Sequence, residues 1–160
     1  MNETKKRNWI RLVALIVIPL AVGMLSSLVT GDNMDIYMNY NQPPFSPPSA
    51  LFPIMWTILY ILMGISAYLV SGPEVPAKQK SAALTIFAVQ LVVNFFWSPF
   101  FFRMGLVLIS FFWIVLLWIL VLIMILVFRR ISKAAGWLQV PYLIWLTIAA
   151  YLNLGIFLLN

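Results

Sequence analysis

Three polar side chains recur at a fixed interval inside an otherwise apolar stretch of the chain. Gln90, Asn94 and Ser98 are four residues apart, so a helix would place them on one face, one turn above another. In a membrane-spanning helix, amides and hydroxyls favour the interior of a bundle, where they find hydrogen-bond partners. One such residue would be interpreted as a contact between helices, whereas three in register favour the wall of a cavity.

Aromatic residues form similar stripes on two other apolar stretches. Trp56 and Tyr60 fall on one helical face, and Tyr142 and Trp145 fall on another together with Ala149. Indole and phenol faces beside a few amide and hydroxyl groups suit a large, flat, apolar ligand. These residues are therefore candidates for a binding pocket.

Several kinds of chemistry are excluded by what the sequence lacks. It has no Cys and no His, which removes thiolate chemistry, disulfides, the commonest metal ligand and the usual general base. No charged residue is expected at mid-membrane, where a proton relay or a charge-coupled transporter would normally need one. Axial ligation of a haem iron would have to come from Tyr or Met, so a metal-free macrocycle is the easier guest. We expect no metal site and no bound cofactor.

The composition indicates which elements position these side chains. Of the 160 residues, 64% are hydrophobic and 9% are charged, far from the roughly 25% charged residues of a soluble domain. Five apolar runs each approach the ~20 residues that a helix needs to cross a bilayer. We predict an all-α integral membrane protein, one bundle of five transmembrane helices over residues 10–29, 51–70, 81–102, 106–128 and 138–159.

The basic residues predict the orientation of this bundle. The net charge of +6 would raise the question of nucleic acid in a soluble protein, but here the basic residues lie at the ends of apolar runs. With the N-terminus inside, the inner segments hold nine of the ten Lys and Arg residues and the outer segments hold only Arg103. The positive-inside rule then places the N-terminus in the cytoplasm and the C-terminus outside.

Two of the predicted helices and one loop have distinctive features. The outer loop over residues 31–48 carries four prolines between Pro43 and Pro48, which make it stiff. A lid and a plain connector are equally compatible with this loop.

Small residues recur every four positions at Gly23, Ser27 and Gly31, which allows close packing in the bundle or in a dimer. The fourth run is otherwise aliphatic, so we expect it to be the most lipid-exposed helix, with Trp113 and Trp118 packing or facing lipid.

Three motifs together resemble the translocator protein family, also called tryptophan-rich sensory proteins or peripheral benzodiazepine receptors. The first comprises residues 43–48, PPFSPP, followed by residues 53–60, PIMWTILY. The second is QLVVNFFWSP over residues 90–99, and the third is PYLIWL over residues 141–146. The match extends in order over nearly the whole chain, and the motifs are specific only in combination.

The resemblance implies a bundle, often dimeric, that binds porphyrins and isoquinoline or benzodiazepine-type ligands in a pocket under the first loop. The ligand-binding candidates from stripes and motifs together are Tyr37, Pro47, Trp56, Tyr60, Gln90, Asn94, Trp97, Ser98, Tyr142, Trp145 and Ala149. Bacterial relatives are reported to degrade protoporphyrin in light, and this would make Trp56 and Trp145 catalytic. The sterol motif proposed for the family is missing here, because no basic residue follows Tyr151.

Three hypotheses follow. The first is a sensor, carrier or regulator that binds tetrapyrroles, and the second is a light-dependent enzyme that degrades protoporphyrin. The third is a structural membrane protein in which the second, third and fifth helices are in dry contact. We expect a porphyrin or another flat apolar ligand and membrane lipid as partners, no nucleic acid, a homodimer as an option, and the plasma membrane of a bacterium as the location.

Overall fold

Five long helices make up the body of the protein. The computed structural model describes residues 3–31 and 34–160, and in this part of the chain five helices are long and apolar enough to span a membrane. No strand occurs among the same residues, which confirms the predicted fold class. In hydrocarbon the backbone must satisfy its own hydrogen bonds, and a helix does this within a single segment. The long helices are α1 (Glu3–Thr30), α3 (Leu51–Val70), α4 (Ala77–Ser98), α5 (Val107–Ile131) and α7 (Val140–Leu159).

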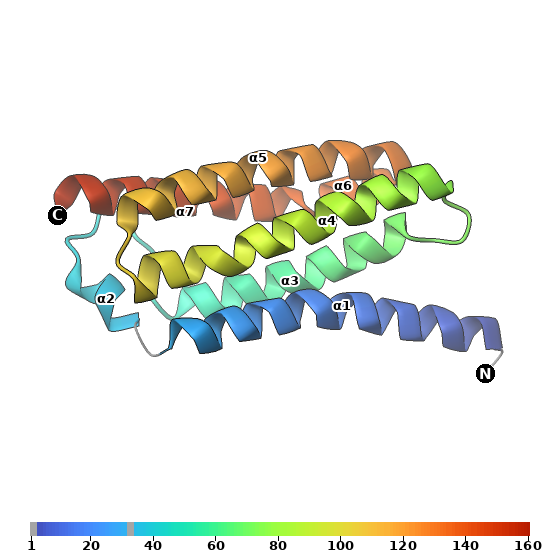
Figure 1. The fold of residues 1–160 in the computed structure, drawn as a ribbon, viewed down its shortest axis with the longest axis horizontal. Coiled ribbons are helices and arrows are strands. Elements are labelled where there is room, and N and C mark those ends of the chain that lie inside the picture. The colour runs from blue at the N-terminus through green and yellow to red at the C-terminus, as the bar shows by residue number, and fades with distance from the viewer. Residues whose placement is uncertain (1–2, 32–33) are drawn as a thin grey trace.

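Three short elements connect these helices. They are α2 (Met34–Asn39), the π-helix η1 (Pro99–Arg103) and α6 (Lys133–Trp137). Figure 1 shows that α2 and the C-terminus lie at one end of the bundle and the N-terminus at the other. We call the first the α2 end and the second the N-terminal end.

The helix bounds differ from the apolar runs for local reasons. Helix α1 extends back to Glu3 because polar residues continue the helix beyond its apolar part. Helix α4 begins at Ala77 instead of residue 81, directly after Pro76. At the other end of α4, the amide of Met104 donates to the carbonyl of Pro99 at 3.0 Å, five residues back, so the chain continues from residue 99 as a π-helix.

Helix α1, and not α5, is the most lipid-exposed of the five spans. It buries the smallest share of its residues within the protein, so the expectation for the fourth run was wrong. Helix α5, in contrast, contacts two neighbouring helices through its indoles. Trp113 donates its Nε1–H to the carbonyl of Val93 at 2.7 Å, and Trp118 donates to the Thr147 hydroxyl at 2.9 Å. These bonds fasten α5 to α4 on one side and to α7 on the other.

Helix α1 packs most tightly on α3 near Gly64. A Cβ atom added to Gly64 would lie 2.7 Å from the carbonyl oxygen of Leu15 and closer still to the backbone of Ile16. Only glycine allows two backbones to approach so closely. This contact lies nearer to the N-terminal end, and toward the α2 end both helices contribute residues to a cavity described below.

The loop that follows α2 lies along α7. The phenol of Tyr151 donates to the carbonyl of Pro44 at 2.8 Å, and the amide of Asn41 donates to Asn160 Oδ1 at 3.0 Å. Pro43 is buried against Gly155 of α7. The loop is therefore attached to the C-terminal half of α7 over much of its length.

Candidate ligand-binding site

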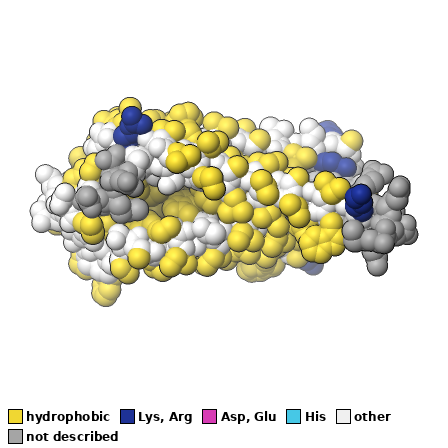
Figure 2. Space-filling model, turned by 90° about the horizontal axis from the view of Figure 1, so that it is seen from below, with side chains coloured by type: hydrophobic (Ala, Val, Ile, Leu, Met, Phe, Trp, Pro, Cys, Tyr) yellow, Lys and Arg dark blue, Asp and Glu magenta, His cyan; other side chains and the backbone are white. Residues whose placement is uncertain are grey.

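The candidate site is a cavity of about 570 Å³ between α1, α3 and α4. Its walls come from residues 20–28 of α1, residues 52–60 of α3, and residues 94–102 of α4 and η1. Ligand pockets in proteins commonly measure ~300–1,000 Å³ and are mainly apolar with a few polar groups. Figure 2 shows a hollow between apolar side chains in the half of the protein nearer the α2 end.

Aromatic rings form one wall of the cavity. Trp56 and Tyr60 stack with their ring centres 5.6 Å apart and their planes 27° from parallel. The ring of Trp97 lies 5.8 Å from that of Trp56, and the Trp97 Nε1–H donates to Asn153 Oδ1 at 3.0 Å. Because neighbouring rings and a hydrogen bond fix these orientations, the cavity offers flat apolar surfaces that are already positioned.

A chain of hydrogen bonds joins this wall to the interior of the bundle. Tyr60 donates to Asn94 Oδ1 at 2.7 Å, and Asn94 Nδ2 donates to the Tyr142 oxygen at 2.8 Å. Tyr142 in turn donates to Gln90 Oε1 at 3.0 Å. The last amide, Gln90 Nε2, lies 3.8 Å from the sulfur of Met63. All four polar side chains are buried, so each depends on its neighbours for hydrogen bonds.

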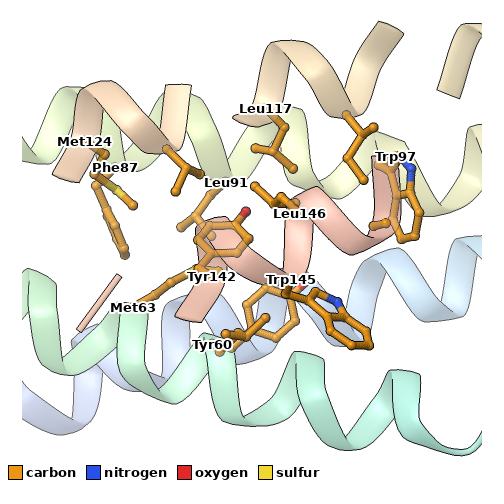
Figure 3. Close-up of a cluster of buried hydrophobic side chains, with 14 of the residues drawn as sticks. Tyr60, Met63, Phe87, Leu91, Trp97, Leu117, Met124, Tyr142, Trp145 and Leu146 are labelled. Atoms are coloured by element: carbon orange, nitrogen blue, oxygen red, sulfur yellow. The ribbon is translucent and has the colours of Figure 1, made fainter. Parts of the chain in front are cut away.

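The space between α3, α4 and α7 is filled, although the sequence pattern predicts a hollow there. A void of only about 10 Å³ lies in this region, beside Tyr37, Phe52, Trp97 and Ala149. Tyr142 takes part in the hydrogen-bond chain, and Trp145 packs edge-on against Phe52 at 5.7 Å. Figure 3 shows Tyr60, Tyr142 and Trp145 within one buried cluster. Aromatic and amide side chains thus occupy the expected hollow.

The structure divides the predicted binding residues into two groups. Five of them line the cavity, namely Trp56, Tyr60, Asn94, Trp97 and Ser98. Six do not, namely Tyr37, Pro47, Gln90, Tyr142, Trp145 and Ala149. The two tryptophans proposed as catalytic fall in different groups. Trp56 faces the cavity, whereas the Nε1–H of Trp145 is buried without a hydrogen-bond partner among the described residues.

Two of the predicted residues connect α2 to the proline-rich loop. The Tyr37 phenol donates to the carbonyl of Pro47 at 3.2 Å. Burial raises the pKa of Tyr37 above its usual range, and a hydrogen bond with the Ser46 side chain offsets part of this effect. Tyr37 therefore remains an uncharged contact between α2 and the loop at neutral pH.

The α1 wall is the part of the cavity that the sequence pattern did not assign to the site. It includes Gly23, Met24, Ser26, Ser27 and Leu28. Gly23 and Ser27 belong to the row of small residues that was interpreted as a packing or dimer contact. The row does serve packing at Gly23, since any Cβ there would overlap the ring of Tyr60. At Ser27 the small side chain leaves part of the cavity open.

Charge has no part in the cavity wall. Among the described residues that line it, none is Asp, Glu, Lys or Arg. The polar groups are hydroxyls, an amide and indole nitrogens, and several of these are already bonded. Ser26, for example, donates to the carbonyl of Phe95 at 2.7 Å. Such a cavity can hold a flat neutral surface by stacking and can orient it through few hydrogen bonds.

Comparisons with known proteins identify similar sequences over nearly the full length. The model of the TspO/MBR family matches residues 15–159. The tryptophan-rich protein TspO of Chlorobaculum tepidum is 41% identical over 142 residues, which cover 88% of this chain and 90% of the relative. The protein of the same name from Archaeoglobus fulgidus is 37% identical over 96% of this chain and 99% of its own length. The translocator protein of Ovis aries is 30% identical over 91% and 87% of the two chains.

Proposed function

Because the chain belongs to the TspO/MBR family, we propose that its cavity binds a tetrapyrrole of the protoporphyrin type. The bound state would make this membrane protein a sensor, carrier or regulator of tetrapyrroles. Isoquinoline and benzodiazepine-type ligands, which are also flat and largely apolar, would occupy the same cavity. The proposal rests mainly on one observation, the stacked pair of Trp56 and Tyr60 on the wall of a cavity of about 570 Å³.

The chemistry of the wall supports a macrocycle over a lipid chain as the guest. A planar ring system gains most from contact with flat aromatic faces, and indole and phenol rings present such faces here. The indole of Trp56 and the hydroxyls of Ser27 and Ser98 line the cavity from three different helices and can meet polar groups at the edge of the guest. The absence of charge from the described wall favours a guest whose central ring is uncharged.

Quenching of tryptophan fluorescence tests the proposal. Purified protein in lipid nanodiscs is titrated with protoporphyrin IX, and saturable quenching is expected. Removing the Trp56 ring deletes a stacking contact with the guest. Such a contact contributes about 0.5–1.5 kcal/mol in addition to the burial of apolar area. Trp56→Ala should therefore weaken binding by roughly tenfold, which corresponds to about 1.4 kcal/mol.

Trp137→Ala is the matched control, because that indole is exposed at the far end of the bundle and lies over Arg129. It should leave the Kd within about twofold of the native value, which is 0.4 kcal/mol or less. Quenching that does not saturate in the native protein, or equal losses in both variants, would contradict the assignment of the cavity.

We also propose that the N-terminal end faces the cytoplasm of a bacterium and the α2 end faces outward. Exposed basic residues gather at the N-terminal end, among them Lys78, Arg129 and Arg130, whereas Arg103 lies at the α2 end. Because the native chain has no Cys, single cysteines report the topology. A membrane-impermeant maleimide applied to intact cells should label Phe45→Cys, at a fully exposed loop position, and should leave Lys78→Cys unlabelled. The reverse pattern would contradict this orientation.

A further inference from the structure

The cavity opens toward the membrane and not toward water. Its rim includes Met24 and Leu28 of α1 and Pro53 and Thr57 of α3, and all four are exposed on the surface of the bundle. These residues fall within the two spans over residues 8–30 and 51–70. The surface around them is therefore covered by acyl chains, and Figure 2 shows apolar side chains around the hollow.

At the α2 end the cavity is closed by three aromatic rings. Phe52 and Phe102 lie on the cavity wall, and the buried ring of Tyr37 covers both of them. The centre of the Tyr37 ring is 5.1 Å from that of Phe52 and 6.4 Å from that of Phe102. Since the following loop is attached to α7 through Pro44 and Asn41, entry from water would require this entire arrangement to open.

Three described polar contacts near the α2 end join α1 to α4 and η1. Ser26 donates to the carbonyl of Phe95 at 2.7 Å, Thr30 and Ser98 are hydrogen bonded at 3.1 Å, and Arg103 donates to the carbonyl of Val29 at 2.7 Å. Pro19 lies between the tight contact at Gly64 and this segment, and a proline removes one hydrogen bond of the helix.

We propose that the guest enters the cavity sideways from the hydrocarbon layer, through the opening between residues 24–28 of α1 and residues 53–57 of α3. This inference rests on the proposed function. It adds the route by which the ligand enters and the phase from which it comes. The ligand is a planar molecule already dissolved in the bilayer. Such a molecule passes from acyl chains to an apolar opening without crossing water. The rings over the α2 end can stay closed during its entry.

A reversible block of the opening tests the route. Thr57→Cys places a single thiol at the rim of a chain that otherwise has no Cys. The thiol is labelled in nanodiscs with a bulky methanethiosulfonate that a reductant removes. Ile58→Cys is the control, because this neighbouring residue is exposed on α3 but is not part of the rim. Stopped-flow quenching with protoporphyrin IX gives the association and dissociation rates.

The label at residue 57 should slow association and dissociation together by about fivefold or more, with a nearly unchanged Kd, and reduction should restore both rates. The label at residue 58 should change neither rate. A second pair lies on the opposite rim, with Leu28→Cys as the test and Leu25→Cys as its control. It should behave in the same way, and it keeps the test possible if Thr57→Cys does not fold.

Each other outcome overturns the lateral route. Native rates in the labelled rim variants would mean that the guest enters elsewhere, while saturable binding would leave the proposed function intact. A higher Kd with an unchanged association rate would make Thr57 a contact of the guest and not part of its entrance. Failure of the unlabelled native protein to bind protoporphyrin at all would reject the proposed function itself, and the route with it.

Discussion

The hydroxyl of Tyr60 lies 2.7 Å from Asn94 Oδ1, and this hydrogen bond joins α3 to α4 at the wall of the cavity. The same amide donates to Tyr142 of α7 at 2.8 Å. One side chain thus connects three helices, because an amide is both an acceptor and a donor. The side chains that shape the cavity and those that hold the bundle together meet at Asn94.

We predict that Asn94→Leu destabilises the protein more than Tyr60→Phe does. Leucine leaves the Tyr60 hydroxyl without its acceptor and removes the donor to Tyr142, and a buried polar group without a partner costs about 1–3 kcal/mol. Tyr60→Phe removes a single bond, worth about 0.6–2 kcal/mol in a membrane protein. The measurement is the thermal unfolding midpoint of each variant in the same detergent.

The double variant provides the control for this comparison. When Asn94 is already leucine, the Tyr60 hydroxyl has lost its partner, so Tyr60→Phe should cost little or should restore some stability. Strictly additive losses in the two single variants and the double variant would show that the two residues do not interact as the structure indicates.

A second prediction concerns Trp145, which lies outside the cavity behind Phe52. If the guest occupies only the cavity between α1, α3 and α4, Trp145→Phe should leave the Kd for protoporphyrin within about twofold, whereas Trp56→Ala should raise it roughly tenfold. The titration of both variants in nanodiscs gives the two values. Equal losses would show that the guest also opens the filled space between α3, α4 and α7.

The five spans and the polar stripe of the third span could be predicted from the sequence because both depend on short-range patterns. Apolar runs of about 20 residues determine where helices cross a bilayer, and a spacing of four residues places Gln90 and Asn94 on one buried face. The family membership was likewise readable from three short motifs taken together.

The position of the cavity could not be predicted, because it depends on side-chain volumes summed over several helices. Tyr142 and Trp145 show the pattern of a pocket wall, but in the folded chain they fill the space that they were expected to line. The open volume instead lies beside Gly23 and Ser27, where the side chains are small. Periodicity identifies the face of a helix that points inward, and it carries no information on whether the opposing faces leave room between them.

A third prediction concerns the close approach of α1 to α3 at Gly64. In Gly64→Ala the new methyl group would meet the backbone of Leu15 and Ile16, which cannot move without displacing α1. Overpacking of this kind typically costs about 1–3 kcal/mol, and the shift should also alter the cavity. Gly72→Ala is the matched control, since its methyl group would meet only the carboxyl end of the Glu74 side chain, which can rotate away. Equal melting temperatures in detergent for the two variants would contradict the close contact.

The last prediction is a pH dependence that originates at Tyr37. Burial raises the pKa of this phenol in the folded protein above the value of about 10 that an unfolded chain would show. A raised pKa means that the fold favours the protonated form, so its contribution to stability is complete below about pH 10 and is lost as the pH rises through the folded-state pKa. Tyr37→Phe should lower the melting temperature slightly at pH 8, because the bond to the Pro47 carbonyl is lost, and should flatten the decline between about pH 9 and 11. Every other residue is the same in the two proteins, so the difference between the two melting curves isolates Tyr37. A difference that does not change over this range would show that ionisation of Tyr37 does not affect the closure of the α2 end.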